Sequence, residues 1–238
     1  MWLRKINVIK WACGVKAGQW MWGNDFDKDN IIENAIDYDQ YKFDATTRKI
    51  IRTKCGFNDS DKVIGFVGRF GEEKNVFFLI KVLQELKKIS DEYKLLTVGG
   101  NELYYEFEKK ISELEIDDLY YSAGIQKNAS EWYQAMDALL LPSFFEGFPM
   151  VLPEAMSFGV VPLAFDSFPA VSDIIIDNKN GFLIPPFSIK QYVKKIEILI
   201  NNDSIRQEMA QEGVKMVQNY SVENIVRQWE ILFYRLKK

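Results

Sequence analysis

Four charged side chains, two acidic and two basic, stand at spacings that could serve one ligand. Glu146 and Glu154 lie in the segment 143–156, which follows an apolar run and leads into a predicted helix. An ionised carboxylate accepts hydrogen bonds from two sugar hydroxyls, so Glu146 could hold a pyranose and Glu154 a ribose. The alternative is structural: Glu146 caps a turn, and Glu154 complements the dipole of a helix that Pro153 places nearby.

The basic pair lies in the segment 65–75, between a predicted strand and a predicted helix. Arg69 and Lys74 combine two cations with open glycine backbone, which is what a diphosphate requires. The alternative leaves both solvated and neutralised by Glu72 and Glu73. The segment matches neither a Gly-x-Gly-x-x-Gly fingerprint nor a Walker loop, which argues against dinucleotide oxidoreductases and P-loop enzymes.

The elements that must position these side chains alternate along the chain. Short apolar runs predict buried strands at 63–68, 95–99, 119–124, 138–142 and 160–165. Between them, helical spacing predicts helices at 75–89, with Asn75 as N-cap, and at 101–114, 129–136 and 151–158. This alternation predicts an α/β fold with a parallel, doubly wound sheet. Ligands of such sheets bind at the carboxyl edge, where all four charged side chains would meet.

The two ends of the chain differ from this middle part. Helices are expected at 189–201, 204–218 and 221–236, the last with Ser221 as N-cap and an apolar stripe. At the other end we expect a strand at 6–13, a short helix at 15–22, and a strand running into a turn at 31–37. The amino-terminal segment is too short to bury its own large apolar side chains, so we interpret it as the end of a domain whose remainder is missing. Exposure of both apolar regions would favour self-association. They comprise Trp2, Trp11, Trp20, Met21 and Trp22, and on the last helix Val222, Ile225, Trp229, Leu232 and Phe233.

Composition excludes several classes of function. The 238 residues include no histidine, which removes Ser-His-Asp hydrolysis and histidine-ligated zinc. Two cysteines, Cys13 and Cys55, are too few for a disulfide framework and lack metal-ligand spacing. A net charge of −4 supplies no general basic field, so we expect no nucleic acid partner. No apolar run is long enough to span a bilayer, and no signal peptide is evident, so we expect a cytoplasmic protein.

Several ordered motifs resemble one known family. The strand-Gly-Arg-x-x-x-x-Lys segment ending at Lys74, the Pro-Ser-x-x-Glu-Gly-Phe-Pro segment at 142–149 and Glu-Ala-Met at 154–156 are similar to those of glycosyltransferase family 4. Residues 34–37 resemble its Asn-Gly-Ile-Asp turn, with Ala35 in place of the glycine, and 180–184 match its Asn-Gly-Phe-Leu segment. The resemblance implies a retaining enzyme with the GT-B fold, in which two Rossmann-like domains face each other across a cleft. It is strongest to bacterial polysaccharide-biosynthesis members.

The resemblance also implies roles for individual residues. Arg69 and Lys74 would neutralise the diphosphate of a nucleotide-sugar donor and stabilise it as the leaving group. Glu146 would contact the donor sugar and Glu154 the ribose. We expect no metal and no cofactor. The remaining donor contacts, in the base pocket and along the loop, would come from Gly124, Ile125, Gln126, Gly147, Phe148, Pro149, Met150 and Val151.

The same resemblance predicts the domains and the reaction. Residues 1–36 would be a remnant of the acceptor domain and linker, 37–219 the donor-binding half of the GT-B fold, and 220–238 a crossover helix. We expect transfer of a hexose from a nucleotide sugar, UDP-linked by resemblance, to a glycan or lipid-linked acceptor, at the inner face of the membrane. We predict that the chain alone binds a nucleoside diphosphate and transfers little.

Alternatives stay open at this point. The chain could be a non-catalytic nucleotide-sugar-binding module, or one half of a split enzyme whose partner chain carries the amino-terminal domain. An oxidoreductase would need the dinucleotide glycine fingerprint. An epimerase of the GT-B type would, by resemblance, need a histidine in the site, and the chain has none.

Overall fold

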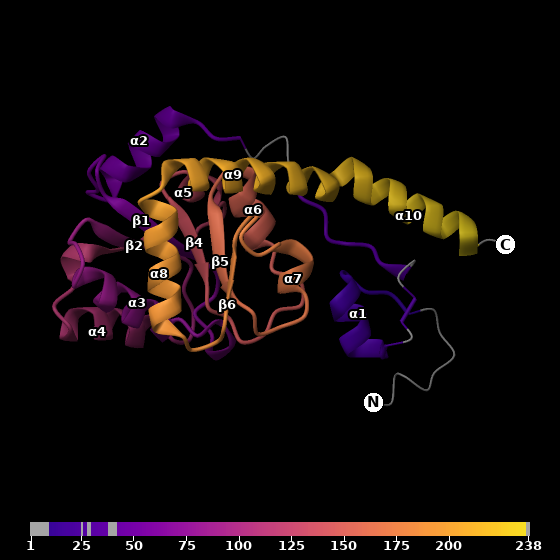
Figure 1. The fold of residues 1–238 in the computed structure, drawn as a ribbon, viewed down its shortest axis with the longest axis horizontal. Coiled ribbons are helices and arrows are strands. Elements are labelled where there is room, and N and C mark those ends of the chain that lie inside the picture. Colours follow the sequence, from indigo (N-terminus) through magenta and orange to yellow (C-terminus); the bar gives the residue numbers. More distant parts are fainter. Residues whose placement is uncertain (1–9, 25, 28–29, 38–41, 237–238) are drawn as a thin grey trace.

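A twisted sheet of six parallel strands forms the centre of the protein (Figure 1). The computed structural model describes residues 10–24, 26–27, 30–37 and 42–236. The strand order is β3-β2-β1-β4-β5-β6, so the chain winds one way from β1 to β3, returns, and winds the other way from β4 to β6. This is the Rossmann-like order, with its switch point between β1 and β4. The strands are β1 (Lys62–Val67), β2 (Tyr93–Val98), β3 (Tyr120–Ser122), β4 (Ala138–Leu141), β5 (Val161–Phe165) and β6 (Phe182–Ile184).

Helices cover both faces of the sheet, as a doubly wound fold requires. Alternate residues of each strand face opposite cores: Ile64 and Phe66 of β1 face one, and Val63 and Val67 the other. The first core packs against α3 (Phe77–Lys87), α4 (Tyr104–Glu113), α8 (Ile189–Ile200) and part of α9 (Asp203–Val217). The second packs against α2 (Ala45–Lys54), α5 (Ser130–Tyr133), α6 (Val151–Ser157) and α7 (Val171–Ile174).

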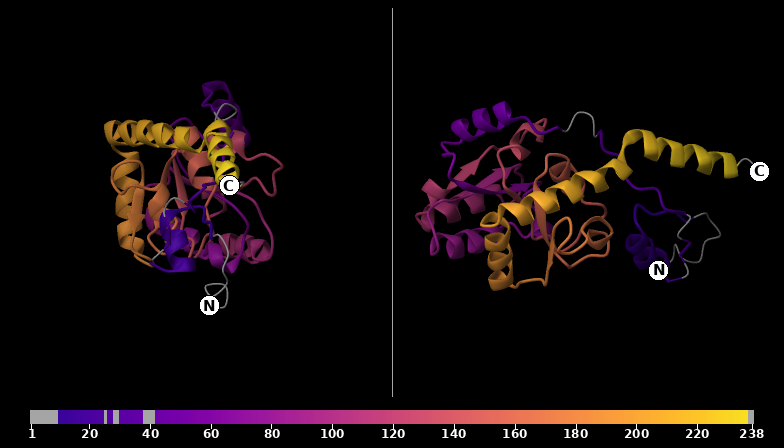
Figure 2. Two further views of the ribbon diagram at one scale, coloured as in Figure 1. Left: turned by 90° about the vertical axis from the view of Figure 1, so that its right-hand side faces the viewer. Right: turned by 45° about the horizontal axis from the view of Figure 1, so that its top comes forward.

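The amino-terminal segment and the last helix lie beside this sandwich. Helix α1 (Val15–Trp22) and the outer end of α10 (Val222–Leu236) extend away from the sheet (Figures 1 and 2). Other residues of the amino-terminal segment meet α10 in a small third cluster, where Ile225 and Leu232 are buried and the Trp11 and Trp229 rings lie 6.5 Å apart. The expected apolar stripe on α10 is thus only partly buried: Trp229 and Phe233 remain 40% and 55% exposed.

Most expected elements are present, and the differences have local causes. Asn75 is not an N-cap: its φ of 51° places it in the left-handed region at the end of a short 3-10 helix (Glu72–Lys74), and α3 begins two residues later. The expected strand at 31–37 is reduced to isolated bridges at Ile31 and Ile36. The expected strand at 6–13 and Trp2 lie mostly or wholly outside the described residues. Ser221 does cap α10, since its Oγ accepts from the Asn224 amide at 3.3 Å.

Candidate functional site

The switch point of the sheet carries an ion pair between the two loops that meet there. Lys74 follows β1 and Glu146 follows β4, and Lys74 Nζ lies 2.5 Å from Glu146 Oε1. The two side chains are only 18% and 11% exposed. Ser143 Oγ donates to the same oxygen at 2.8 Å. Among the described residues no hydrogen bond reaches the other carboxylate oxygen, Glu146 Oε2, so that oxygen can accept from a ligand.

Backbone contacts fix the two loops against each other. The Phe144 amide donates to the carbonyl of Glu73 at 2.8 Å, and Asn75 Nδ2 donates to the carbonyl of Pro142 at 3.3 Å. The left-handed conformation of Asn75 turns the chain directly after Lys74, so the lysine is held at the end of the 3-10 helix. Hydrogen bonds between the two loops thus bring Lys74 and Glu146, 72 residues apart in sequence, next to each other.

Arg69 occupies the rim of the same edge. Its Nη2 lies 2.5 Å from Glu73 Oε1, and its side chain is 56% exposed. The hydrogen bond from Arg69 to Glu73 raises the pKa of Arg69. The pKa of Glu73 is lowered first by the hydrogen bond from its own backbone amide and then by the bond from Arg69. Without a ligand, Arg69 is therefore neutralised by Glu73, as one reading of the sequence expected. Lys74 instead pairs with Glu146, and not with Glu72 or Glu73. An exposed pair of this kind contributes little stability, so Arg69 can exchange its partner easily.

A hollow of about 340 Å³ opens beside Arg69, above the carboxyl ends of β1, β2 and β3. Two glycines with positive φ shape it, Gly68 at 154° and Gly99 at 135°. A Cβ on Gly99 would overlap the carbonyl oxygen of Gly68, so only glycine lets the two turns come this close. The Gly99 amide also donates to the Gly124 carbonyl at 2.8 Å. The walls include Arg69, Gly100, Asn101, Ile125, Gln126 and Ala129.

Glu154 is the second carboxylate. It lies in the first turn of α6, as expected from Pro153, which favours the start of a helix. Tyr133 Oη donates to Glu154 Oε2 at 2.7 Å. Burial raises the pKa of Glu154, and the tyrosine hydrogen bond only partly opposes that shift. As at Glu146, no hydrogen bond reaches the second oxygen among the described residues. A buried carboxylate with one open oxygen gains most from a ligand that donates hydroxyl protons to it.

The loop between the two glutamates leaves its backbone accessible. No atom lies within 4 Å of the position that a Cβ on Gly147 would occupy. Phe148 packs on Tyr220, with ring centroids 5.7 Å apart, while Pro149 is buried. Met150 precedes α6 and Val151 begins it, both partly buried. The backbone at the start of α6 therefore lies in sequence and in space between the two carboxylates.

The structure adds contributors that the sequence reasoning did not single out. Ser143 and Tyr133 hold the two glutamates, and Gly99, Gly100 and Asn101 line the hollow. The paired glycines after β2 were the available signal, since a strand ending in Gly-Gly at this edge suggests close backbone approach.

Within the described part of the chain, no three or more histidine, cysteine, aspartate or glutamate side chains gather as a metal site would need. None of the described helices is long and apolar enough to cross a membrane.

Known proteins resemble this chain in sequence, and solved structures resemble it in fold. The sequence model of the family described as Glycosyl transferases group 1 matches residues 47–216. An uncharacterized glycosyltransferase of Haemophilus influenzae is 31% identical over 170 residues, covering 71% of this chain and 48% of that protein. A Campylobacter jejuni protein, named as an alpha-1,4-N-acetyl-D-galactosaminyltransferase of a PP-undecaprenol glycan, is 26% identical over 201 residues, covering 79% of this chain and 55% of that protein.

Among solved structures, Anabaena HepE in complex with UDP superposes with a TM-score of 0.83 at 20% identity. The match covers 94% of this chain and 63% of that one, and it shows that the fold is shared. The chain spans about half the length of the two curated relatives.

Proposed function

Since the chain belongs to the family of glycosyl transferases group 1, we propose that its carboxyl edge binds the nucleotide-sugar donor, with UDP as the nucleotide. The proposal rests on two carboxylates that each use only one of their two oxygens in hydrogen bonds with the described residues. Glu146 and Glu154 each have one oxygen held by the protein and one open oxygen at the same sheet edge. Sugar hydroxyls are the donors that such oxygens accept.

We assign each part of the donor to a part of the site, from the base to the sugar. The base enters the hollow beside Ile125 and Gln126, and the ribose hydroxyls donate to Glu154. The diphosphate lies between Arg69 and Lys74, each of which is held by a carboxylate in the ligand-free protein. The hexose donates to Glu146 Oε2 and to the open backbone after it. UDP is favoured over other nucleotides by the UDP in the complex of the related fold.

The chemistry that this arrangement would supply is charge stabilisation. As the anomeric bond breaks, negative charge builds on the departing diphosphate. Lys74 has already lost most of its water, so it stabilises that charge without much reorganisation. Arg69 is exposed and gives up its contact with Glu73 to bind the phosphate. Because Glu146 remains bonded to Lys74, the sugar and the leaving group are held by one connected pair.

For the whole protein we propose a retaining hexosyltransferase of bacterial polysaccharide biosynthesis, working in the cytoplasm. Support comes from the alpha linkage and the undecaprenol-linked glycan in the name of the Campylobacter jejuni relative. Because the chain spans only about half of these relatives, transfer is a proposal for the full-length architecture, and donor binding is the proposal for this chain. The second candidate shares the donor site and differs in turnover: a non-catalytic nucleotide-sugar-binding module, or one half of a split enzyme.

A thermal-shift panel of UDP, GDP, ADP and CDP tests the donor assignment. At 100 times its Kd a ligand stabilises by about 2.7 kcal/mol, which raises the melting temperature of a chain of this size by roughly 5–10 °C. We expect the largest shift with UDP, and its loss in Lys74→Ala. Lys88→Ala, a change in an exposed ion pair at the carboxyl end of α3, is the matched control. An undiminished UDP shift in both Lys74→Ala and Arg69→Ala would show that the diphosphate assignment is wrong.

Activity separates the two candidates. The purified chain, supplied with UDP-sugar and glycan acceptors, is expected to bind the donor and release little UDP. Robust transfer by the chain alone would contradict this expectation. Restoration of transfer by a separately expressed amino-terminal domain of a relative would favour the split-enzyme candidate.

A further inference from the structure

Tyr104 lies where the loops after β1 and β2 meet the end of β3, beside the hollow assigned to the base. It is the first residue of α4, and its ring packs edge-on against the buried Phe70, with ring centroids 5.4 Å apart. A Cβ on Gly100, which lines the hollow, would lie 4.0 Å from Tyr104 Cγ and 3.1 Å from Ile125 Cγ1. Tyr104 and Ile125 therefore both border Gly100 in the wall of the hollow.

The hydroxyl of Tyr104 reaches the last residue of β3. Tyr104 Oη and Ser122 Oγ lie 2.9 Å apart, so one hydroxyl donates to the other. Ser122 Oγ also accepts from the Gly124 amide at 3.2 Å, which closes a serine turn at the start of the base loop, residues 122–126. A single serine oxygen thus connects α4 to the backbone of the base loop.

Gly124 uses both of its backbone polar groups inside the protein. Its amide donates to Ser122, and its carbonyl accepts from the Gly99 amide at 2.8 Å. The next residue differs: the side chain of Ile125 is 79% exposed, and among the described residues no hydrogen bond reaches its amide or its carbonyl. The turn at Gly124 therefore leaves the backbone of Ile125 available to a ligand in the hollow that Ile125 lines.

Few contacts fix the orientation of the base loop. Within the described residues, the ladder of hydrogen bonds with β2 extends to the Ala123 amide, and one backbone bond from Gly99 ties Gly124 to the loop after β2. A loop held by one bond can pivot about it. The Tyr104–Ser122 bond supplies a second fixed point, because the same serine oxygen holds the Gly124 amide.

We propose that Tyr104 and Ser122 are positioning residues for the nucleotide base, which hold residues 124–126 in the orientation that binds it. The proposal rests on the assignment of the donor to this sheet edge. Tyr104 also packs on Phe70, which directly follows Arg69, so one side chain borders both the base loop and the diphosphate loop. A loop that is already ordered loses less conformational freedom when the ligand binds, and affinity rises accordingly.

Calorimetric titration with uridine and with UDP separates the base from the diphosphate. Tyr104→Phe removes one hydroxyl and keeps the ring, and Ser122→Ala removes the other hydroxyl. Each variant should weaken uridine and UDP by the same factor, roughly five- to tenfold for one lost hydrogen bond, so the ratio of the two dissociation constants is unchanged. The double variant should bind uridine like Ser122→Ala, because both changes delete the same bond.

Conservative and neighbouring variants guard against a general loss of structure. Ser122→Thr keeps the hydroxyl and should bind uridine within about twofold of the wild type. Tyr105→Phe is the matched control, since Tyr105 is adjacent in sequence and 78% exposed, and it should leave uridine affinity unchanged. Circular dichroism confirms that each variant is folded.

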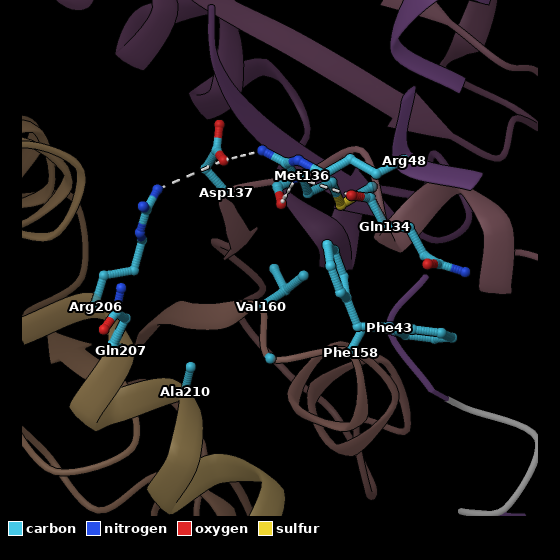
Figure 3. Close-up of a pocket in the computed structure, with 11 residues that line it drawn as sticks. Phe43, Arg48, Gln134, Met136, Asp137, Phe158, Val160, Arg206, Gln207 and Ala210 are labelled. Atoms are coloured by element: carbon cyan, nitrogen blue, oxygen red, sulfur yellow. Dashed lines mark hydrogen bonds and ion pairs between the residues drawn. The ribbon is translucent and has the colours of Figure 1, made fainter. Parts of the chain in front are cut away.

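A distant control lies in the hollow at the amino-terminal edge of the sheet (Figure 3). There Arg48 donates to the carbonyls of Gln134 and Met136, and Arg206 Nη1 lies 3.7 Å from Asp137 Oδ1. These polar groups hold the fold together far from the base loop. Arg206→Gln should therefore leave uridine affinity unchanged, whatever its effect on the melting temperature.

Hydrogen exchange of the ligand-free chain tests the positioning without a nucleotide. Peptides that cover residues 122–126 should exchange about threefold faster or more in Tyr104→Phe and in Ser122→Ala than in the wild type. Uridine affinity unchanged in both variants overturns the proposal, even if exchange is faster, and leaves the donor assignment standing. A wild type that binds none of UDP, GDP, ADP and CDP overturns the donor assignment and this proposal with it.

Discussion

Removing the charge of Lys74 is the perturbation whose outcome the structure constrains most closely. Lys74→Met keeps the length of the side chain and deletes the ammonium group 2.5 Å from Glu146 Oε1. Glu146 would then be an 11%-exposed carboxylate with Ser143 as its remaining hydrogen-bond donor. The folded state is therefore destabilised, because it keeps a desolvated carboxylate that has lost its counterion.

The magnitude lies between two known limits. Breaking a fully buried pair costs about 3–5 kcal/mol, and an exposed pair contributes about 0–1 kcal/mol. With side chains 18% and 11% exposed, the Lys74–Glu146 pair lies nearer the buried limit, and the Ser143 hydrogen bond softens the loss. We expect Lys74→Met to lower the free energy of unfolding by about 2 kcal/mol. The melting temperature should fall by roughly 4–8 °C.

A double-mutant cycle measured by urea unfolding isolates the pair. Lys74→Met, Glu146→Gln and the double variant should give a coupling energy of about 1–2 kcal/mol, because the double variant leaves no buried charge. Lys88→Met, which breaks a pair with Glu85 at 67% and 44% exposure, should cost less than about 0.5 kcal/mol. Additive effects of the two site variants within about 0.3 kcal/mol would refute the reasoning.

Three other predictions concern single residues. Gly99→Ala should destabilise the fold by at least about 3 kcal/mol in urea, through positive φ and overlap with the Gly68 carbonyl, whereas Gly147→Ala, with open space around it, should change stability little. Because burial holds the pKa of Glu154 above its ordinary 4.5, the folded chain keeps that proton to higher pH than the unfolded chain. Stability should therefore fall as pH rises from 4.5 through the raised pKa, and Glu154→Gln should lack this slope; equal slopes by thermal unfolding would contradict it. Burial raises the pKa of Cys55 to about 12, so iodoacetamide at pH 8 should label it at least tenfold more slowly in the folded chain than in urea, and equal rates would count against that environment.

The sheet could be predicted because most of its strands are buried. β1, β2, β4 and β5 are mostly apolar runs ended by Gly, Pro or a polar residue, which is the pattern of buried parallel strands. β6 has only three residues, too few for periodicity to identify. Helix α2 escaped prediction because Ile51 is its single buried apolar residue, although Asp44 provides a clear cap.

The sequence predicted which charged residues lie at this sheet edge, but not which of them form ion pairs with each other. Motif order brought Arg69, Lys74, Glu146 and Glu154 to one sheet edge, which is where the fold places them. Which acid neutralises which base depends on how two distant loops pack, so the sequence suggested Glu72 and Glu73 while the fold joins Lys74 to Glu146. The functional roles of all these residues, and the domain boundaries at 36 and 219, stay predictions.

The central claim is that the switch point binds a diphosphate through Lys74. Calorimetric titration of the chain with UDP and with uridine measures the diphosphate contribution as the ratio of their two dissociation constants. We predict that UDP binds the wild type at least a hundredfold more tightly than uridine, and that Lys74→Ala reduces this ratio at least tenfold while uridine affinity is unchanged. A ratio that is the same in Lys74→Ala as in the wild type would contradict the claim.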